Sequence, residues 1–331
     1  MRLQMESKDP EEAEQTESEK FAEMMLKIKL SFVDSYKASL PALHFAAKVG
    51  DMEMCRRLLD DGADLRARCS SRGATVLHYA AMNNVHGVEI FDYLIKKGAE
   101  IAEDAEGETP IHVANRVKNF QVALKLLEKW GERQFLFCVK SDLLELSKFL
   151  VKKDGKKVLK VIGKCGKTAL HFAAQSASLE MCQWLIEQGQ SIEIANQTTF
   201  ATFLHYAARN KKHGTKIIRF YGPSLNSCVN RIDFLSYTPL HHALVEENLE
   251  AADALITIGA NIRVKKYENN NLLHFCILQN KISGAKFVHE KDKHLITEKG
   301  ERFKTAFQLA AERENVELCQ WLVDEGANID S

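Results

Sequence analysis

Apolar and polar positions recur together along this chain. A leucine or isoleucine followed by histidine appears at His44, His78 and His112, a spacing of 34 residues. Small apolar residues follow each pair, and then an amphipathic stretch that closes on a glycine. A period of this length with a helical face in each copy predicts repeated helix-turn-helix units. The same register returns at His171, His205, His241, His274 and, with glutamine in place of histidine, Gln308.

The residues around each copy predict where its helices begin and end. Threonine stands before the apolar stretch, as at Thr75 and Thr109, where its side chain can cap the first helix. Proline follows some of these threonines, at a helical position where its missing N–H is not needed. Glycines such as Gly62 and Gly98 follow the second stretch, where a left-handed backbone favours them. Each copy is too small to fold alone, so stacking must stabilise it.

The recurring sequence resembles the ankyrin repeat. Typical copies read TVLHYAAMNNVHGVEIFDYLIKKGAEI from Thr75 and TALHFAAQSASLEMCQWLIEQGQSI from Thr168. The family pattern runs T-P-L-H-x-A-A, then an amphipathic helix, then L-L-x-x-G-A. The resemblance implies an all-α solenoid of about nine helix-turn-helix repeats with short β-hairpin fingers, preceded by an N-terminal helix.

Two copies depart from this pattern. The fourth, at residues 132–160, keeps a helical pattern and Gly155 but lacks Thr-x-Leu-His, so it has no capping residue. In the sixth, Gly222 and Pro223 interrupt the second helix and predict a loop that continues to Asn230. Both copies are expected to be weak seams in the stack.

Three segments are therefore predicted. Residues 1–18 are acidic and polar, which predicts a disordered tail. Residues 19–38 carry apolar side chains at helical spacing and predict a helix that caps the first repeat. An amphipathic helix that binds a partner is the alternative for this segment. Residues 39–331 form the solenoid.

Composition narrows the function further. The 45 basic and 45 acidic residues give zero formal net charge, without the basic excess typical of nucleic-acid binding. No apolar run reaches the roughly 20 residues that cross a membrane, and the acidic first residues predict no signal peptide. The eight cysteines are scattered without a Cys-x-x-Cys pair, which favours reduced thiols in the cytoplasm, with the nucleus as a second possibility.

No catalytic, cofactor-binding or metal-binding set stands out, so neither enzyme activity nor a cofactor is predicted. The repeat histidines are expected to tie the turn of one repeat to the backbone of the next. The sequence from Gly163 to Thr168 looks like the end of a phosphate-binding loop, but that pattern needs glycine where Val161 stands. The cluster from His289 to His294 fits no zinc spacing and is interpreted as a solvated loop.

The resemblance also implies that partner proteins bind along the concave surface formed by the finger tips and first helices. Exposed aromatic and arginine side chains are typical anchors of such interfaces. Phe234, Tyr237 and Tyr267 are expected on adjacent fingers and are the favoured anchors; packing on each other to brace the fingers is the alternative. The residues predicted to bind a partner are Arg72, Tyr79, Arg116, Lys164, Lys167, Tyr206, Arg209, Phe234, Tyr237 and Tyr267.

A basic run is the second candidate surface. Between Lys148 and Lys167 there are eight lysines and one acid, Asp154. A solvated helix face explains most runs of this kind, and a docking patch for an acidic partner or for phosphates is the alternative.

Two functions remain after this reading of the sequence. The first is a monomeric, non-catalytic scaffold or adaptor that binds partner proteins. The second is the recognition arm of a larger enzyme or ion channel whose active module lies outside this chain. Coding sequence beyond Ser331 would favour the second.

Overall fold

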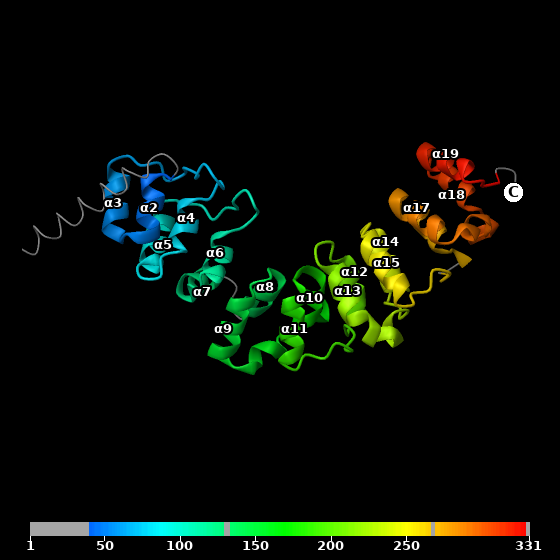
Figure 1. Cartoon of the computed structure of the whole chain (residues 1–331), viewed down its shortest axis with the longest axis horizontal. Helices are drawn as coiled ribbons and strands as arrows, with labels where there is room; N and C mark the ends of the chain where they lie inside the picture. The colour runs from blue at the N-terminus through cyan, green and yellow to red at the C-terminus, as the bar shows by residue number, and fades with distance from the viewer. Residues whose placement is uncertain (1–39, 129–132, 266–268, 329–331) are drawn as a thin grey trace, which may run out of the picture. The chain divides into compact units, whose positions relative to one another are not determined.

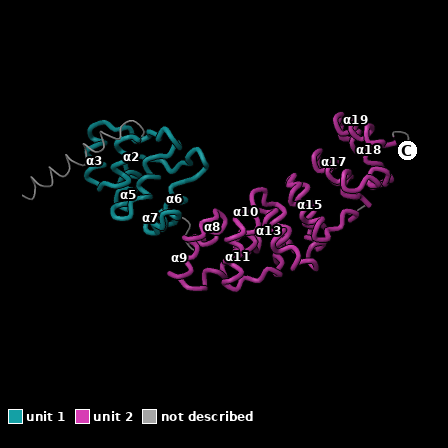
Figure 2. The backbone as a smooth tube through the Cα atoms, viewed as in Figure 1, with its two compact units in different colours: residues 1–129 teal, residues 130–331 magenta. Residues whose placement is uncertain are grey.

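The computed structural model describes residues 40–128, 133–265 and 269–328. The chain divides into two compact units, residues 1–129 and 130–331 (Figure 2). Each unit is a stack of paired α-helices (Figure 1). The predicted tail and capping helix, residues 1–18 and 19–38, lie outside the described residues.

Unit 1 contains the first three repeats. Its helices are α2 (Ala42–Val49), α3 (Met52–Asp60), α4 (Val76–Ala80), α5 (Gly87–Lys96), α6 (Pro110–Arg116) and α7 (Phe120–Leu127). First helices pack on first helices, as α2 does on α4, and second helices pack on second helices, as α3 does on α5. Buried leucines such as Leu43, Leu77 and Leu94 fill the space between the layers.

Unit 2 contains the remaining six repeats. Its α-helices are α8 (Gln134–Lys140), α9 (Leu144–Asp154), α10 (Ala169–Ser176), α11 (Leu179–Glu187), α12 (Phe203–Arg209), α13 (Gly214–Tyr221), α14 (Pro239–Val245), α15 (Leu249–Thr257), α16 (Leu272–Leu278), α17 (Ile282–Lys291), α18 (Ala306–Glu312) and α19 (Val316–Asp324). The described residues of the two units therefore hold nine helix pairs, as the sequence period predicts.

In five repeats the threonine and histidine of the signature form one hydrogen-bonded unit. In repeat six the N–H of Thr202 donates to Nδ1 of His205 at 3.0 Å. Because Nδ1 accepts this bond, the imidazole is neutral and its proton is on Nε2. Nε2 donates to the carbonyl of Tyr237 in the next finger at 2.9 Å. His78 and His171 make the same bond to the carbonyls of Glu108 and Ile194, so the expected tie is confirmed for these three histidines. It is not made by His44 or by Nε2 of His274.

Asparagines make a second set of ties between neighbouring repeats. The side-chain amide of Asn210 donates to the carbonyls of Ala174 and Ala177, both at 3.0 Å. Its Oδ1 accepts from the N–H of His213 at 2.9 Å, so the buried amide is satisfied on both sides. Asn83, Asn119 and Asn248 bond the preceding repeat in the same way.

The fingers differ from the predicted β-hairpins. Within the described ranges, ladder pairing is limited to an isolated bridge between Arg68 and Thr75. The finger of repeat seven is a tight turn, closed by one bond from the N–H of Asp233 to the carbonyl of Tyr237 at 2.9 Å. A turn that closes over so few residues leaves no length for paired strands.

The two irregular repeats are both ordered. Helix α8 of repeat four begins after Arg133 without a side-chain cap, as the missing threonine predicts. Helix α13 of repeat six ends at Tyr221, where Gly222 and Pro223 follow. The predicted loop is wrong, because a 3-10 helix, η4 (Gly222–Cys228), occupies this segment and buries Leu225 against the stack.

Candidate protein-binding surface

Three of the predicted binding residues lie in unit 1 and are engaged in contacts within it. Nε of Arg72 lies 3.0 Å from Oε1 of Glu106 in the next finger. Nη1 of Arg116 lies 2.6 Å from Oε2 of Glu108. Tyr79 packs edge-on against a histidine of the first repeat, with ring centroids 5.3 Å apart. Exposed ion pairs are worth at most about 1 kcal/mol, so a partner could replace them, but nothing else singles out this surface.

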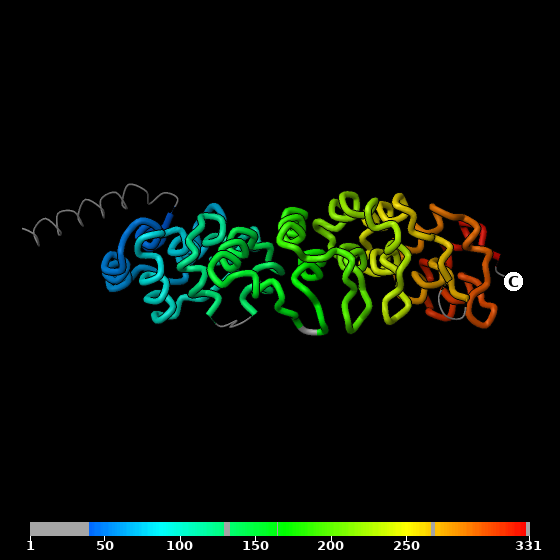
Figure 3. Tube along the Cα trace, turned by 90° about the horizontal axis from the view of Figure 1, so that it is seen from below, coloured from blue at the N-terminus to red at the C-terminus, as the bar shows by residue number. Residues whose placement is uncertain are grey.

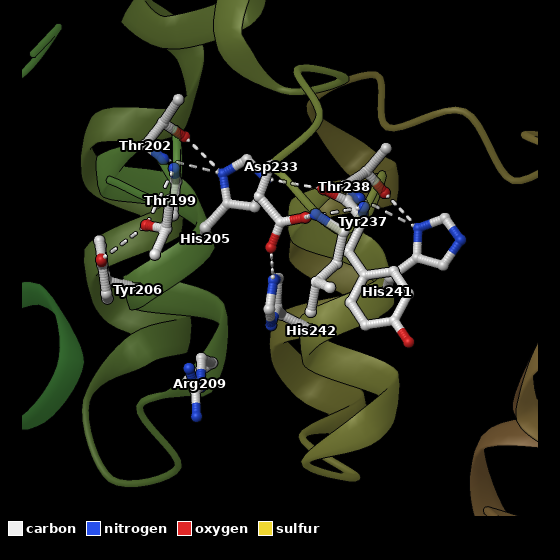
Figure 4. Close-up of polar contacts among 12 residues, drawn as sticks. Thr199, Thr202, His205, Tyr206, Arg209, Asp233, Tyr237, Thr238, His241 and His242 are labelled. Atoms are coloured by element: carbon white, nitrogen blue, oxygen red, sulfur yellow. Dashed lines mark hydrogen bonds and ion pairs between the residues drawn. The ribbon is translucent and has the colours of Figure 1, made fainter. Parts of the chain in front are cut away.

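In unit 2, the fingers of repeats six and seven hold a buried acid (Figure 4). Oδ1 of Asp233 accepts from the N–H groups of Leu235 and Tyr237, both at 2.9 Å. Its Oδ2 accepts from Nε2 of His242 at 2.8 Å. Burial opposes ionisation of Asp233, but the hydrogen bonds from Tyr237 and His242 keep its pKa below the ordinary value. Burial lowers the pKa of His242, so its neutral imidazole donates to the carboxylate of Asp233. The three hydrogen bonds to this carboxylate make the turn rigid.

Tyr237 supports this finger rather than projecting from it. Its ring stacks on His241 with centroids 5.5 Å apart and meets Phe275 edge-on at 5.1 Å. The side chain is half-buried. Tyr237 thus braces its finger through His241 and Phe275, not through the packing on Phe234 and Tyr267 that the alternative expected, and Tyr267 lies outside the described residues.

Four apolar side chains at the tips of the same two fingers have the opposite environment. Phe234 is 59% exposed and Leu235 is 46% exposed. Ile232 and Phe200 are similarly open to solvent. The N–H of Phe234 donates to the carbonyl of Thr199 at 2.9 Å, which joins the two fingers. The two fingers, which precede α12 and α14, project from the same side of unit 2 (Figure 3). We call Phe200, Ile232, Phe234 and Leu235 the apolar finger patch.

A polar depression lies on the first helices of repeats four to seven. Its volume is about 330 Å³. We call it the basic pocket, because it contains three cationic side chains and one carboxylate. Its lining residues are Lys140, Lys167, Phe172, Gln175, Ser176, Arg209 and Glu246.

Lys167 is the most constrained cation of the basic pocket. Its Nζ donates to Oε1 of Gln175 at 2.8 Å and lies 4.9 Å from the ring centroid of Tyr206 and 5.5 Å from that of Phe172. Burial, and then the nearby charge of Arg209, lower the pKa of Lys167. Burial and the charge of Arg209 both disfavour the protonated form of Lys167. Packing of its ammonium group on two aromatic faces stabilises that form.

The basic pocket and the apolar finger patch are connected through repeat six. The hydroxyl of Tyr206 lies 3.5 Å from Oγ1 of Thr199, and the carbonyl of Thr199 holds Phe234. On the side of the basic pocket, the Nζ of Lys167 lies over the Tyr206 ring. Arg209 follows Tyr206 on the same helix, α12 (Figure 4). Tyr206 itself is only 3% exposed, so this link runs beneath the surface, and the prediction that Tyr206 contacts a partner is wrong.

Sequence reasoning found part of this surface and missed part of it. The structure brings the predicted Lys167, Tyr206 and Arg209 together, and places Lys164 in the short 3-10 helix η3 (Lys164–Gly166). Lys140 was missed because its repeat lacks the Leu-His signature. Aligning Cys138-Val139 with Ala-Ala of the next repeat would have placed Lys140 in the register of Gln175 and Arg209.

The basic run contributes little to this surface. Lys148 pairs with Glu145 at 2.9 Å, and Lys152 and Lys153 lie exposed on α9. Of the run, Lys167 lines the basic pocket.

Two features are absent from the described part of the chain. No helix there is long and apolar enough to cross a membrane. Nor does that part contain three or more histidine, cysteine or acidic side chains grouped so that they could hold a metal ion. The solvated loop predicted from His289 to His294 is wrong, because α17 continues to Lys291 and buries His289, whose Nε2 lies 3.2 Å from Oε2 of Glu325.

Comparison with known families identifies the class of solenoid. The profile for three ankyrin repeats matches residues 28–134 and again residues 135–226. A profile for a single ankyrin repeat matches residues 303–331. These matches cover more than half of the chain, and they agree with the helix pairs and threonine-histidine caps. The chain belongs to the ankyrin-repeat family.

Individual relatives differ in how much of their length is matched. The chain is 28% identical over 252 residues to probable 26S proteasome regulatory subunit p28 of Saccharomyces cerevisiae, covering 70% of this chain and 98% of p28. It is 26% identical over 246 residues to mouse inversin, covering 69% of this chain but 22% of inversin. It is 23% identical over 294 residues to human transient receptor potential cation channel subfamily A member 1, covering 70% of this chain and 25% of the channel. In the last two, the matched part is a fraction of a much longer protein.

Proposed function

We propose that this chain is a non-catalytic, monomeric scaffold that binds a partner protein over the fingers and first helices of unit 2. The apolar finger patch is the observation that carries the proposal. Four large apolar side chains, each about half exposed, lie on two fingers that a backbone hydrogen bond joins. Leaving such a cluster in water is unfavourable, and contiguous apolar patches rimmed by polar groups mark interaction sites.

The rigidity of the fingers supports the same function. Asp233 accepts three hydrogen bonds within 2.9 Å, and Tyr237 packs on two rings behind it. Preorganised anchors lose little conformational entropy when a partner binds. The turn therefore presents Phe234 and Leu235 in a fixed position.

The relatives support a binding module but differ in its setting. The match to 98% of a protein named as a regulatory subunit supports a solenoid that acts on its own. The match to a quarter of a cation channel supports the alternative, a recognition arm of a larger enzyme or channel. All eight cysteines are unpaired, which supports a reducing compartment such as the cytoplasm or the nucleus.

A paired substitution in the apolar finger patch tests the proposal. Replacing Phe234 and Leu235 with serine together is expected to reduce capture of specific partners from a lysate at least about tenfold, because interface anchors contribute more than about 1 kcal/mol each. Stability should change little, since both side chains are largely exposed. The measurement is quantitative mass spectrometry of proteins captured by each variant.

The matched control removes an exposed apolar side chain elsewhere in unit 2. Val316 is 80% exposed at the start of α19, and Val316→Ser should leave capture unchanged. Equal recovery of every captured protein by wild type, the control and the double variant would contradict the proposed surface.

A further inference from the structure

The charges of the basic pocket are not balanced within it. Arg209 faces Glu246, with Nε 3.5 Å from Oε1. Lys140 and Lys167 have no carboxylate within ion-pair distance among the described residues. Lys167 is held instead by the neutral Gln175 and by aromatic rings. Two ammonium groups thus converge on one small concavity, from the end of α8 and from the finger before α10, and neither is paired with a carboxylate.

Placing these cations together is unfavourable in the free protein. The charges of Arg209 and Lys140 both lower the pKa of Lys167, in addition to its burial. Like charges that converge in a concave, partly desolvated site raise the local concentration of anions. An anionic group that entered the pocket would relieve this repulsion, so the arrangement favours an acidic ligand.

We propose that the basic pocket binds side-chain carboxylates of an acidic segment of the partner, while apolar side chains of the same segment cover the apolar finger patch. The inference rests on the proposed function and specifies the partner. The partner segment carries aspartate or glutamate close to large apolar residues, because Lys167 packs on Tyr206, which contacts Thr199, and Thr199 bonds the finger of Phe234.

The carboxylate of Glu246 in the pocket favours singly charged carboxylates over a phosphate dianion. An arginine fork can bind either group through two parallel hydrogen bonds. The single arginine of the pocket already faces Glu246, and that carboxylate would repel a dianion. The remaining cations are lysines, which act as separate point charges. Two such charges on adjacent repeats suit successive acidic side chains along a segment.

Selection from a random dodecapeptide display library on the intact chain tests this inference. The expected result is enrichment of peptides that combine aspartate or glutamate with leucine or aromatic residues. Binding of a selected peptide, measured by fluorescence anisotropy, should weaken as sodium chloride is raised, because screening acts on the charge pairs. Replacing its acids with the corresponding amides should weaken binding at least about tenfold.

Matched variants locate the site of the charges. Lys140→Glu is expected to weaken binding at least about tenfold, whereas Lys153→Glu, with the same change in charge on exposed α9, should have little effect. Lys167→Met provides a second test that retains the packing on Tyr206 but removes the ammonium group. It should also weaken binding of acidic peptides while leaving the thermal unfolding midpoint close to that of wild type.

The outcomes separate this inference from the proposed function. The acidic partner would be overturned if the selected peptides lack acids, or if acidic peptides bind Lys140→Glu and Lys167→Met as well as wild type. The proposed finger surface would still stand in that case, provided that Phe234→Ser with Leu235→Ser abolishes binding. Equal affinity of the selected peptides for wild type and for the serine double variant would contradict the proposed function instead. Stronger binding of a phosphoserine version of the selected peptide than of its glutamate version would overturn the carboxylate assignment.

Discussion

Replacing Gly214 with alanine is expected to destabilise unit 2 by about 2 to 3 kcal/mol, although the same change inside a helix usually stabilises by about 0.5 to 1 kcal/mol. The reason is steric. A Cβ at Gly214 would lie 2.2 Å from the carbonyl oxygen of Ala207, so the start of α13 would have to move away from α12. The measurement is urea unfolding followed by tryptophan fluorescence, because all three tryptophans of the sequence lie in residues 130–331.

Lys216→Ala is the control for this substitution. Lys216 is exposed on the same helix, and both residues favour helix, so the unfolding curve should stay within about 0.5 kcal/mol of wild type. A Gly214→Ala variant as stable as wild type would show that the two helices of repeat six are not as close as described.

Unit 2 is expected to lose stability as the pH falls from about 6.5 to about 4, with roughly 3 kcal/mol of the loss from His205 alone. Burial lowers the pKa of His205 from 6.5 to about 4. Its contribution is therefore complete above pH 6.5, where the unfolded imidazole is also neutral, and disappears as the pH falls through 4. Protonation at Nδ1 removes the acceptor for the N–H of Thr202. Unfolding curves measured across this pH range provide the test.

His205→Gln is a control that the chain itself suggests. In the last repeat Gln308 takes the histidine register, and its Oε1 accepts from the N–H of Thr305 at 3.0 Å. Glutamine can therefore keep the cap without titrating. The variant should be less dependent on pH between 6.5 and 4 than wild type, even if it is less stable at neutral pH. An unchanged pH dependence would mean that His205 is not the group responsible.

Much of the fold could be predicted because each repeat carries its own local signals. The 34-residue spacing, the capping threonines and the histidines predict both the helix pairs and the bonds between them. The segment after Pro223 could not be predicted in this way. Proline ends the α-helix locally, but burial of Leu225 against the stack decides that a 3-10 helix follows.

The candidate surface was predictable only where it follows the repeat register. Lys167, Tyr206 and Arg209 stand at regular positions, so Lys167 and Arg209 line one pocket and Lys167 packs on the buried Tyr206. The different environments of Phe234 and Tyr237 arise from their neighbours. Tyr237 packs on Phe275 of the next repeat, whereas Phe234, in the turn that Asp233 closes, is 59% exposed.

Hydrogen exchange of the complex with a captured partner, followed by mass spectrometry, tests the central claim most directly. If a partner binds over the fingers and first helices of unit 2, backbone exchange should slow in residues 194–201 and 231–237 and along α10 and α12. The second helices α11 and α13 should exchange as in the free chain. Protection confined to those second helices, or to unit 1, would contradict the account.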